Sequence, residues 1–434
     1  LGASVGAAVG QEEEVGRYLE GGGLVARRLA APEASAVNAR LAPLLSPTDG
    51  RQVRRGESLV DIALKFDQHQ VLAILCPDAS PPAGALKRLP SHACPSEAQA
   101  VAKQVYGCLE AEDGRAQVPV LHTTFALPFE LLSFPEEERR QAMAELLDLD
   151  AKGTLEASAE PVINWHASLL PHSRLHPLHN GGMGDCLLHS VSLATNGTED
   201  LDLGLRKALT RALKTVDLYP RWREARAREA AINGYRADDW QWRKEWAELS
   251  RAAQTPRSSL EQTHVWALAH VLRRPVIMYA VHRIRNFKDE VVGVASHRGI
   301  YLPLLLDPAH CSPNPLALAY VRGHYVGLVG SEQEASGASR IMLPLTTPDN
   351  NLLPLHFLLD HEVGQEGAMV SAWLSCCSIG GVLCAEQRCE ARARRPQPCQ
   401  ALLTRYTQDL RRRFSPKGPA SQEEREPSEA QTDQ

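Results

Sequence analysis

The chain has 434 residues, of which 44% are hydrophobic and 23% are charged. These values are ordinary for folded domains, and they exclude a fibrous chain or one dominated by disorder. The net charge of -5 provides no basic footprint for nucleic acid. The sequence also has no apolar run of about 18 residues, the length that a membrane-spanning helix requires. We therefore expect neither nucleic acid nor a membrane as a partner.

The ten cysteines are not arranged as a disulfide framework. No CxxC spacing occurs, so the sequence predicts neither a zinc finger nor another metal site, and no cofactor is expected. Two of the cysteines, Cys376 and Cys377, are adjacent, which suits reduced thiols. Because reduced thiols are typical of intracellular compartments, a cytoplasmic and nuclear location is expected.

Two loosely related patterns occur near the start of the chain, at 7–23 and 56–75. Each joins glycines to short apolar-periodic runs and resembles an ankyrin repeat, in which a turn leads into two antiparallel helices. We expect residues 1–87 to form a small all-helical, ankyrin-like module with a protein-binding surface; a plain helical subdomain is the alternative. The proline-rich stretch 77–97 marks the expected boundary of this module.

A second unit is expected from 88 to 414, followed by a disordered tail at 415–434 that is rich in Glu, Ser, Pro and Gln. The first clear helix of this unit is predicted to begin at a capping box of Ser133 and Glu136 and to end near Asp148. An acid in the last turn of a helix faces the negative end of the helix dipole. A cation such as a histidinium would stabilise Asp148 there.

A glycine-rich stretch leads directly into a cysteine at 181–186. Gly184 and its neighbours allow a sharp turn, and Cys186 opens an apolar-periodic run that predicts a helix ending at Asn196-Gly197. Unpaired N–H groups at a helix N-terminus favour a thiolate, so the thiol pKa is expected to fall, and the same N–H groups could hold an oxyanion. The alternative is an inert buried cysteine, since free cysteine is often buried.

Further helices and then strands follow this cysteine. Helices are predicted from Thr198 and from a capping box of Ser258 and Glu261, and the charged stretch 220–250 carries four tryptophans that serve either core packing or a partner surface. The predicted strands lie at 276–281, 300–305, 325–329, 352–359 and 381–384. The pattern predicts an α+β or α/β domain with a central sheet.

His324 is the candidate base for the cysteine. It stands after Gly323 at the start of a predicted strand, in the Cys-before-His order of papain-like thiol hydrolases. The alternative for any histidine is a structural role in the core. Two competitors, His264 and His270, lie six residues apart on one helix, so they do not both face a common site.

Several of these stretches together resemble the OTU deubiquitinases, in the subgroup that carries an ankyrin-like module before the catalytic domain. The resemblance extends over nearly the whole chain up to about residue 414. In one member of that subgroup zinc fingers that bind ubiquitin precede the module. The absence of a CxxC pair here predicts none in this chain, which would be either a fragment of a longer protein or a form that has lost them. The motifs that carry the resemblance are Gly184–Leu188, Ser259–Ile277, Gly299–Leu305, Arg322–Tyr325 and Ile163-Asn164-Trp165.

The resemblance implies an α+β, OTU-type cysteine protease domain with a central sheet between helical regions. It implies that Cys186 is the nucleophile, that His324 is the general base and that Asp148, from a helix before the cysteine, orients the histidine. Asp150, two residues away, could be mistaken for that acid. The oxyanion loop would consist of Gly182, Met183, Gly184 and Asp185.

The resemblance also implies the substrates, which are polyubiquitin chains and ubiquitinated proteins. Chains linked through ubiquitin lysines twenty-nine and thirty-three would be preferred, with some activity on lysine-sixty-three chains, and the N-terminal module would bind ubiquitin. A monomer and a role in Wnt-type signalling are expected. One alternative is a catalytically inactive ubiquitin-binding scaffold. Another is a thiol hydrolase or acyl transferase that is indifferent to ubiquitin.

Overall fold

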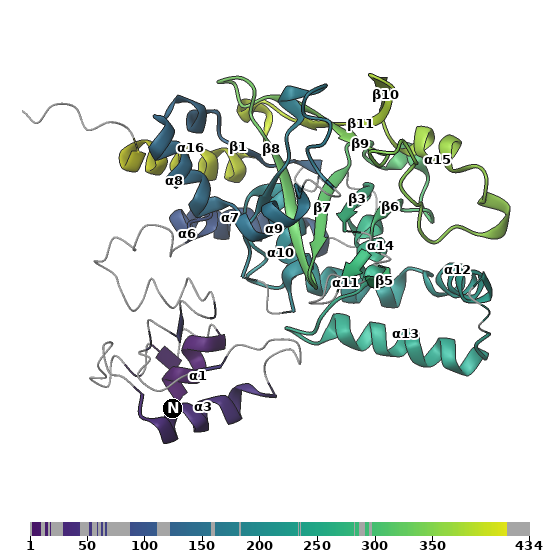
Figure 1. The fold of residues 1–434 in the computed structure, drawn as a ribbon, viewed down its shortest axis with the longest axis horizontal. Coiled ribbons are helices and arrows are strands. Elements are labelled where there is room, and N and C mark those ends of the chain that lie inside the picture. Colours follow the sequence, from purple (N-terminus) through teal and green to yellow (C-terminus); the bar gives the residue numbers. More distant parts are fainter. Residues whose placement is uncertain are drawn as a thin grey trace, which may run out of the picture.

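A mixed six-stranded sheet forms the centre of the protein (Figure 1). Its strands follow the order β1-β8-β7-β3-β6, and the short strand β2 pairs with β8 beside β1. Strands β3 and β7 are parallel, whereas β7 and β8 form an antiparallel hairpin. A three-stranded sheet, β10-β11-β9, packs beside the central sheet. The expected α+β architecture is thereby confirmed, with helices around a central sheet.

The computed structural model describes most of the catalytic region and only parts of the N-terminal stretch. Gly182, Met183 and the expected tail at 415–434 lie outside the described residues. The described residues are 2–9, 14–15, 18, 29–43, 52–53, 59, 62–63, 66, 87–110, 122–157, 161–181, 184–232, 234, 236–281, 283–285, 291–294 and 297–414.

The strands are short and the helices are of ordinary length. Among the described residues, no helix is both long and apolar enough to cross a membrane. The α-helices are α1 Gly2–Val9, α3 Ala31–Leu41, α6 Pro90–Ala93, α7 Pro95–Glu110, α8 Glu136–Leu146, α9 Leu149–Leu155, α10 Cys186–Asn196, α11 Gly204–Thr215, α12 Tyr219–Ile232, α13 Asp239–Gln254, α14 Gln262–Leu272, α15 Glu366–Trp373 and α16 Gln397–Phe414. The strands are β1 Ala126–Leu127, β2 His176–Leu178, β3 Val276–Ala280, β4 Arg283–Arg285, β5 Val291–Val294, β6 Gly299–Tyr301, β7 Leu316–Val321, β8 His324–Ser331, β9 Ser339–Pro344, β10 Cys376–Ile379 and β11 Val382–Cys389.

The central sheet is buried on both faces, and alternate residues of one strand enter different cores. On β8, Tyr325 and Val329 pack in the core that contains α10 and α14, whereas Val326 and Leu328 pack in the core that contains β9 and α15. This alternation is the period-two pattern of a strand. Because both faces are covered, β8 is apolar along almost its whole length, and the prediction of a core strand at 325–329 is confirmed.

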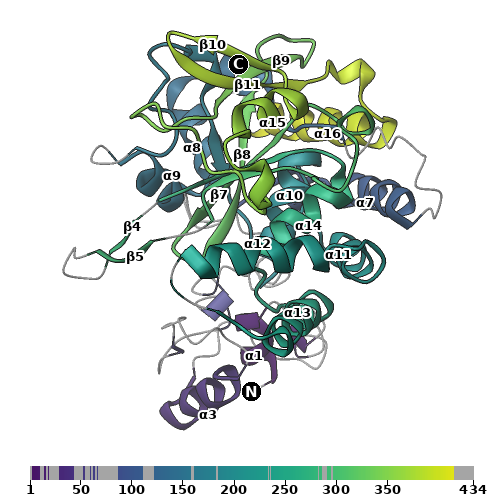
Figure 2. The ribbon, with the colours of Figure 1, turned by 90° about the vertical axis from the view of Figure 1, so that its right-hand side faces the viewer.

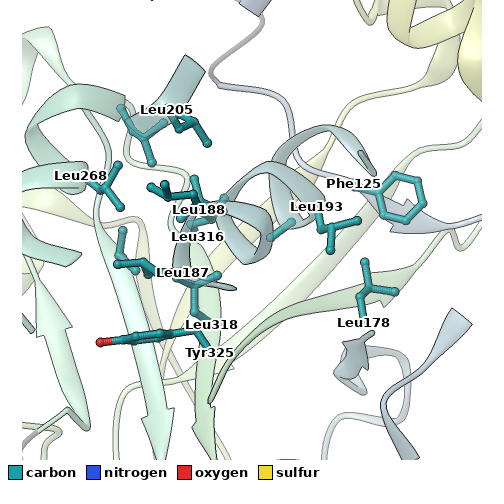
Figure 3. Close-up of a cluster of buried hydrophobic side chains, with 14 of the residues drawn as sticks. Phe125, Leu178, Leu187, Leu188, Leu193, Leu205, Leu268, Leu316, Leu318 and Tyr325 are labelled. Carbon is teal, nitrogen blue, oxygen red and sulfur yellow. The ribbon is translucent and has the colours of Figure 1, made fainter. Parts of the chain in front are cut away.

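Helix α10 lies directly on strands β7 and β8. Leu187 of the helix points toward Leu318 and Tyr325 of the sheet, whereas Leu188 lies on the side of Leu205 and Leu268 (Figure 3). At Gly327 the approach is so close that a Cβ atom would lie 2.7 Å from the carbonyl oxygen of Ser190. Only a glycine accommodates the helix backbone at that distance. This contact fixes the height of α10 above the strand that begins with His324.

A two-residue turn joins β7 to β8. Arg322 and Gly323 have φ values of 50° and 85°, and Val321 pairs with His324 across the turn. Two successive positive φ values are typical of the type I′ hairpin turn, whose twist matches the twist of the strands. The turn places His324 at the first position of β8, as expected from the sequence.

Helices α12 and α13 lie side by side at one edge of the domain (Figure 1, Figure 2). For the tryptophans at 220–250 the expected core packing is confirmed at three of the four positions, and the alternative of a partner surface stays a prediction. Trp222 and Trp242 are buried and Trp246 packs against them, whereas Trp240 is 61% exposed.

The N-terminal stretch contains helices α1 and α3 and a small buried cluster of its own. Val37 and Leu41 of α3 pack in this cluster with Ala7, Ile62 and Phe66. Most positions of the two predicted repeats lie outside the described residues, so the ankyrin-like character of 1–87 stays a prediction. Prolines at 90 and 95 begin helices α6 and α7, so the predicted irregular stretch 77–97 ends earlier than expected.

The predicted start of the helix before Asp148 is wrong, whereas its predicted end near Asp148 is confirmed. Helix α8 begins at Glu136 after Pro135, and its start has no side-chain cap. Ser133 instead lies in a 3-10 turn, where its hydroxyl donates to the carbonyl oxygen of Glu130. The helix ends at Leu146, two residues before Asp148.

Two further helix starts and two strand predictions are also wrong. Helix α11 begins at Gly204 and not at Thr198, because the Asp200 carboxylate accepts the N–H groups of the first helical turn. Helix α14 begins at Gln262, beyond Ser258. Strand β6 ends at Tyr301 because a turn follows, and the stretch 352–359 contributes only isolated bridges.

Gly327→Ala tests the contact between α10 and β8. We expect it to lower the free energy of unfolding by about 1–3 kcal/mol, because the new methyl group would force the helix backbone away from the strand. Urea unfolding measures the change. Gly153→Ala is the matched control, since among the described residues nothing outside its own helix lies within 4 Å of its Cβ position, and it should not destabilise the protein. Equal stabilities of Gly327→Ala and the wild type would contradict the account.

Candidate active site

Cys186 is the first residue of α10 and is only 8% exposed. The expected helix N-terminus is therefore confirmed, but the expected fall of the thiol pKa is wrong. Burial raises the pKa of Cys186 to about 11, and the neighbouring Asp185 carboxylate adds to the rise. Hydrogen bonds from the main chain of Tyr325 and Leu187 act in the opposite direction without cancelling it. In this structure Cys186 is a neutral thiol at pH 7.

Gly184 and Asp185 form the described part of the expected oxyanion loop. Gly184 has a φ of 84°, and a Cβ atom at this position would lie 2.0 Å from the carbonyl oxygen of Arg257. Both the backbone conformation and the lack of space require glycine here. Asp185 is buried and immediately precedes α10. The loop is thus fixed against the segment around Arg257 before the helix begins.

The His324 imidazole stands at the start of β8, next to the residue whose main chain contacts the Cys186 thiol. Burial lowers the pKa of His324, the Asp148 carboxylate opposes this effect, and the charge of His189 adds to it. The net direction is downward from 6.5, so the imidazole is neutral at pH 7 and can accept a proton.

The two competing histidines have structural roles. His264 accepts a hydrogen bond from the Glu261 N–H at 2.8 Å, and its other ring nitrogen lies 3.0 Å from the Leu249 carbonyl oxygen. Nδ1 of His270 lies 2.9 Å from the Trp266 carbonyl oxygen. Both are buried in α14, and burial lowers the pKa of each to about 4.

Asp148 is the N-cap of α9, not the last residue of α8. Its carboxylate accepts the Ala151 N–H at 2.8 Å, so it faces the positive end of a helix dipole, where an acid is stabilised. The expectation that the dipole opposes Asp148 is therefore wrong.

Asp148 and His324 line the same cavity, which has a volume of about 300 Å³. His179 and Arg322 also line this cavity, as does Asp150, which is exposed in the first turn of α9. Among the acids that the structure describes, Asp148 is the one whose charge raises the pKa of His324. Cys186 does not line the cavity, since its thiol is covered.

The strand β2 connects the three side chains. The Asp148 N–H donates to the Pro177 carbonyl oxygen at 3.0 Å, and Pro177 pairs with Leu328 of β8. Two residues beyond the strand, the Asn180 amide donates to the Tyr325 carbonyl oxygen at 2.9 Å and to the Ser190 hydroxyl at 3.2 Å. Asn180 therefore ties the strand of His324 to the helix of Cys186, a role that the sequence motifs did not suggest.

A second buried contact holds the beginning of the loop. The Glu199 carboxylate accepts the Gly181 N–H at 3.0 Å and lies 3.0 Å from Nε2 of His92 in α6. Burial alone would raise the pKa of Glu199, but His92 and the Gly181 N–H keep it far below its usual range. Sequence reasoning missed this pair because its members are 107 residues apart.

Comparison with known proteins agrees with the geometry. The family of OTU-like cysteine proteases matches residues 181–325, the stretch that holds Cys186 and His324. The sequence motifs are similar to those of TRABID, an OTU deubiquitinase. Over 426 residues the chain is 34% identical to ubiquitin thioesterase trabid of Drosophila melanogaster, a match that covers 95% of this chain and 53% of that relative. The chain thus spans about half the length of the relative, and it belongs to the family of OTU-like cysteine proteases.

Proposed function

We propose that the protein is a deubiquitinase that hydrolyses isopeptide bonds of ubiquitin chains. One observation carries the proposal: the Cys186 thiol contacts the main chain next to His324, while His324 and Asp148 share one cavity. A cysteine at a helix N-terminus with a neutral imidazole nearby is the arrangement that thiol hydrolysis requires. The named relative is a ubiquitin thioesterase, which supports ubiquitin as the substrate.

In the proposed reaction the His324 imidazole removes the proton of the Cys186 thiol. The sulfur attacks the carbonyl carbon of the isopeptide bond, and main-chain N–H groups of the oxyanion loop, which comprises Gly182, Met183, Gly184 and Asp185, stabilise the negative oxygen. The lysine amine leaves with the proton from the imidazolium, and a thioester remains on Cys186. Water, deprotonated by His324, attacks the thioester carbonyl, the C–S bond breaks and the ubiquitin carboxylate is released. The imidazolium then returns its proton to the Cys186 sulfur. Asp148 stabilises the imidazolium in both halves of the reaction.

In the free enzyme Cys186 and His324 are both neutral, because burial raises the pKa of Cys186 and lowers that of His324. Proton transfer from sulfur to nitrogen is then unfavourable until a bound substrate and the loop N–H groups stabilise the new charges. We propose that the thiol becomes reactive mainly in the substrate complex. This property would limit side reactions of the free enzyme with small electrophiles and oxidants.

The finer features of the function follow from the family resemblance. We propose preferred cleavage of chains linked through ubiquitin lysines twenty-nine and thirty-three, with some cleavage of lysine-sixty-three chains. In the same proposal residues 1–87 are an ankyrin-like ubiquitin-binding module, 88–414 are the catalytic domain, and the protein acts in the cytoplasm and nucleus in Wnt-type signalling. Ubiquitin chains and ubiquitinated proteins are its partners.

A catalytically inactive ubiquitin-binding scaffold is the second candidate. The observation that favours it is the covered, protonated Cys186 thiol. Binding of ubiquitin chains without turnover would distinguish the scaffold from the enzyme.

Cleavage of a complete panel of diubiquitins tests the proposed activity. Wild-type protein should cleave at least one linkage, and Cys186→Ala and His324→Ala should each lower the rate on the order of 10³-fold or more, because each removes a group that acts in every turnover. Cys311→Ala and His310→Ala, which alter a partly buried thiol and an exposed imidazole, are the controls and should retain activity. Turnover by Cys186→Ala would refute the mechanism, and wild-type binding without cleavage would favour the scaffold.

Asp148→Asn separates the charge of Asp148 from its capping role. Asparagine caps helices as well as aspartate does, so α9 should remain intact. We expect kcat to fall on the order of 10²-fold, because the imidazolium loses its counter-charge. The carboxylate raises the pKa of His324, so its removal should move the acid limb of the kcat/KM profile to lower pH.

Asp150→Asn is the matched control for Asp148→Asn, since it changes an exposed acid of the same helix. Its kcat and pH profile should equal those of the wild type. An equal loss of kcat in both variants, or an unmoved acid limb in Asp148→Asn, would remove Asp148 from the proposed site.

A further inference from the structure

A buried cation lies beneath the loop that precedes Cys186. Arg206 of α11 is 3% exposed, and its Nε donates to the Asp185 carboxylate at 2.6 Å. Burial of two opposite charges is costly unless every polar group finds a partner. The remaining guanidinium nitrogens meet this condition, because Nη2 also lies 2.6 Å from the Asp185 carboxylate and both terminal nitrogens contact main-chain carbonyl oxygens. They donate to the carbonyl oxygens of Gly184 at 3.2 Å, Ser258 at 3.0 Å, Ala252 and Thr255 at 2.8 Å, and Ala253 at 3.3 Å.

These contacts join the loop to the segment 252–258. The second carboxylate oxygen of Asp185 accepts the Arg257 N–H at 3.1 Å. Gly184 lies so close to the Arg257 carbonyl that it tolerates no side chain. The loop, the carboxylate and the guanidinium therefore form one rigid unit.

The contact with the Gly184 carbonyl has a direct consequence for the next N–H group. In a planar trans peptide the C=O and N–H bonds point in opposite directions. Because Arg206 holds the Gly184 oxygen toward the interior, the Asp185 N–H points away from Arg206. Within the described part of the chain, this N–H donates to no acceptor. It is thus a fixed and free donor one residue before the proposed nucleophile.

We infer that Arg206 is a positioning residue for the oxyanion hole, and that it orients the Gly184–Asp185 peptide so that the Asp185 N–H meets the developing negative oxygen. This inference rests on the proposed hydrolase function. A lysine in its place would retain the charge but not the planar, forked set of donors that reaches several carbonyl oxygens at once. Arg206 itself touches no reacting atom.

Arg206→Lys and Asp185→Asn test the inference in the full chain. A ubiquitin with a C-terminal fluorogenic amide reports kcat and KM, and iodoacetamide reports the reactivity of Cys186 without need of an oxyanion hole. We expect Arg206→Lys to lower kcat on the order of 10²-fold, the loss typical for a misplaced oxyanion donor, while KM and the alkylation rate change less than about threefold. Asp185→Asn should lower kcat by about tenfold. The amide oxygen of the asparagine still accepts from Arg206, but its NH2 group faces the Arg257 N–H, and two donors do not form a hydrogen bond.

Arg211→Ala is the matched control on the same helix, since within the described residues the Arg211 side chain donates to the Leu109 carbonyl oxygen at the surface and not to the loop before Cys186. It should retain wild-type kcat. If Arg206→Lys does not fold, as judged by its thermal transition, the kcat and alkylation rate of Asp185→Asn alone test the role of Arg206. Unchanged kcat in the folded variants, or equal losses of kcat and alkylation rate, would overturn the role of Arg206. A wild-type protein that leaves ubiquitin amides intact would instead overturn the proposed function.

Discussion

The close approach of α10 to β8 is the constraint on which the site depends. Gly327 allows the carbonyl oxygen of Ser190 to come within contact distance of the strand, and the Asn180 side chain bonds both the helix and the strand. Cys186 begins the helix and His324 begins the strand, so the separation of their side chains is set by this packing. The chemistry is thus positioned by rigid elements and not by the loop alone.

Burial determines the electrostatic state of the site. Burial of Cys186 excludes water and therefore removes the solvation that a thiolate needs. This effect on the thiol pKa exceeds the stabilisation by nearby N–H groups. Asp148 acts in the opposite direction on His324, since its charge favours the imidazolium that forms during the reaction. In the free enzyme Cys186 and His324 are neutral, and the Asp148 carboxylate lies where it can stabilise the imidazolium. This state is consistent with catalysis that begins only when bound substrate stabilises the thiolate and the imidazolium further.

Local sequence patterns predicted the main elements of the site, but they did not reveal the contacts between residues that are distant in the sequence. The glycine-rich approach and apolar period placed Cys186 at a helix start, and β-rich runs placed His324 at a strand start. The roles of Arg206 and Asn180 could not be predicted, because their partners lie far away in the sequence and no spacing connects them. The thiol pKa was mispredicted for the same reason, since burial is a property of tertiary packing. The N-cap role of Asp148 escaped notice because two short helices meet there.

The most direct test of the central claim is the site at which a ubiquitin with a C-terminal electrophile becomes attached. The adduct would be formed with the full chain and mapped by mass spectrometry after digestion. The account predicts modification of Cys186 alone, at a rate that falls sharply in His324→Ala. Attachment to another thiol, such as Cys311 or Cys377, or an unchanged rate without the imidazole, would contradict it.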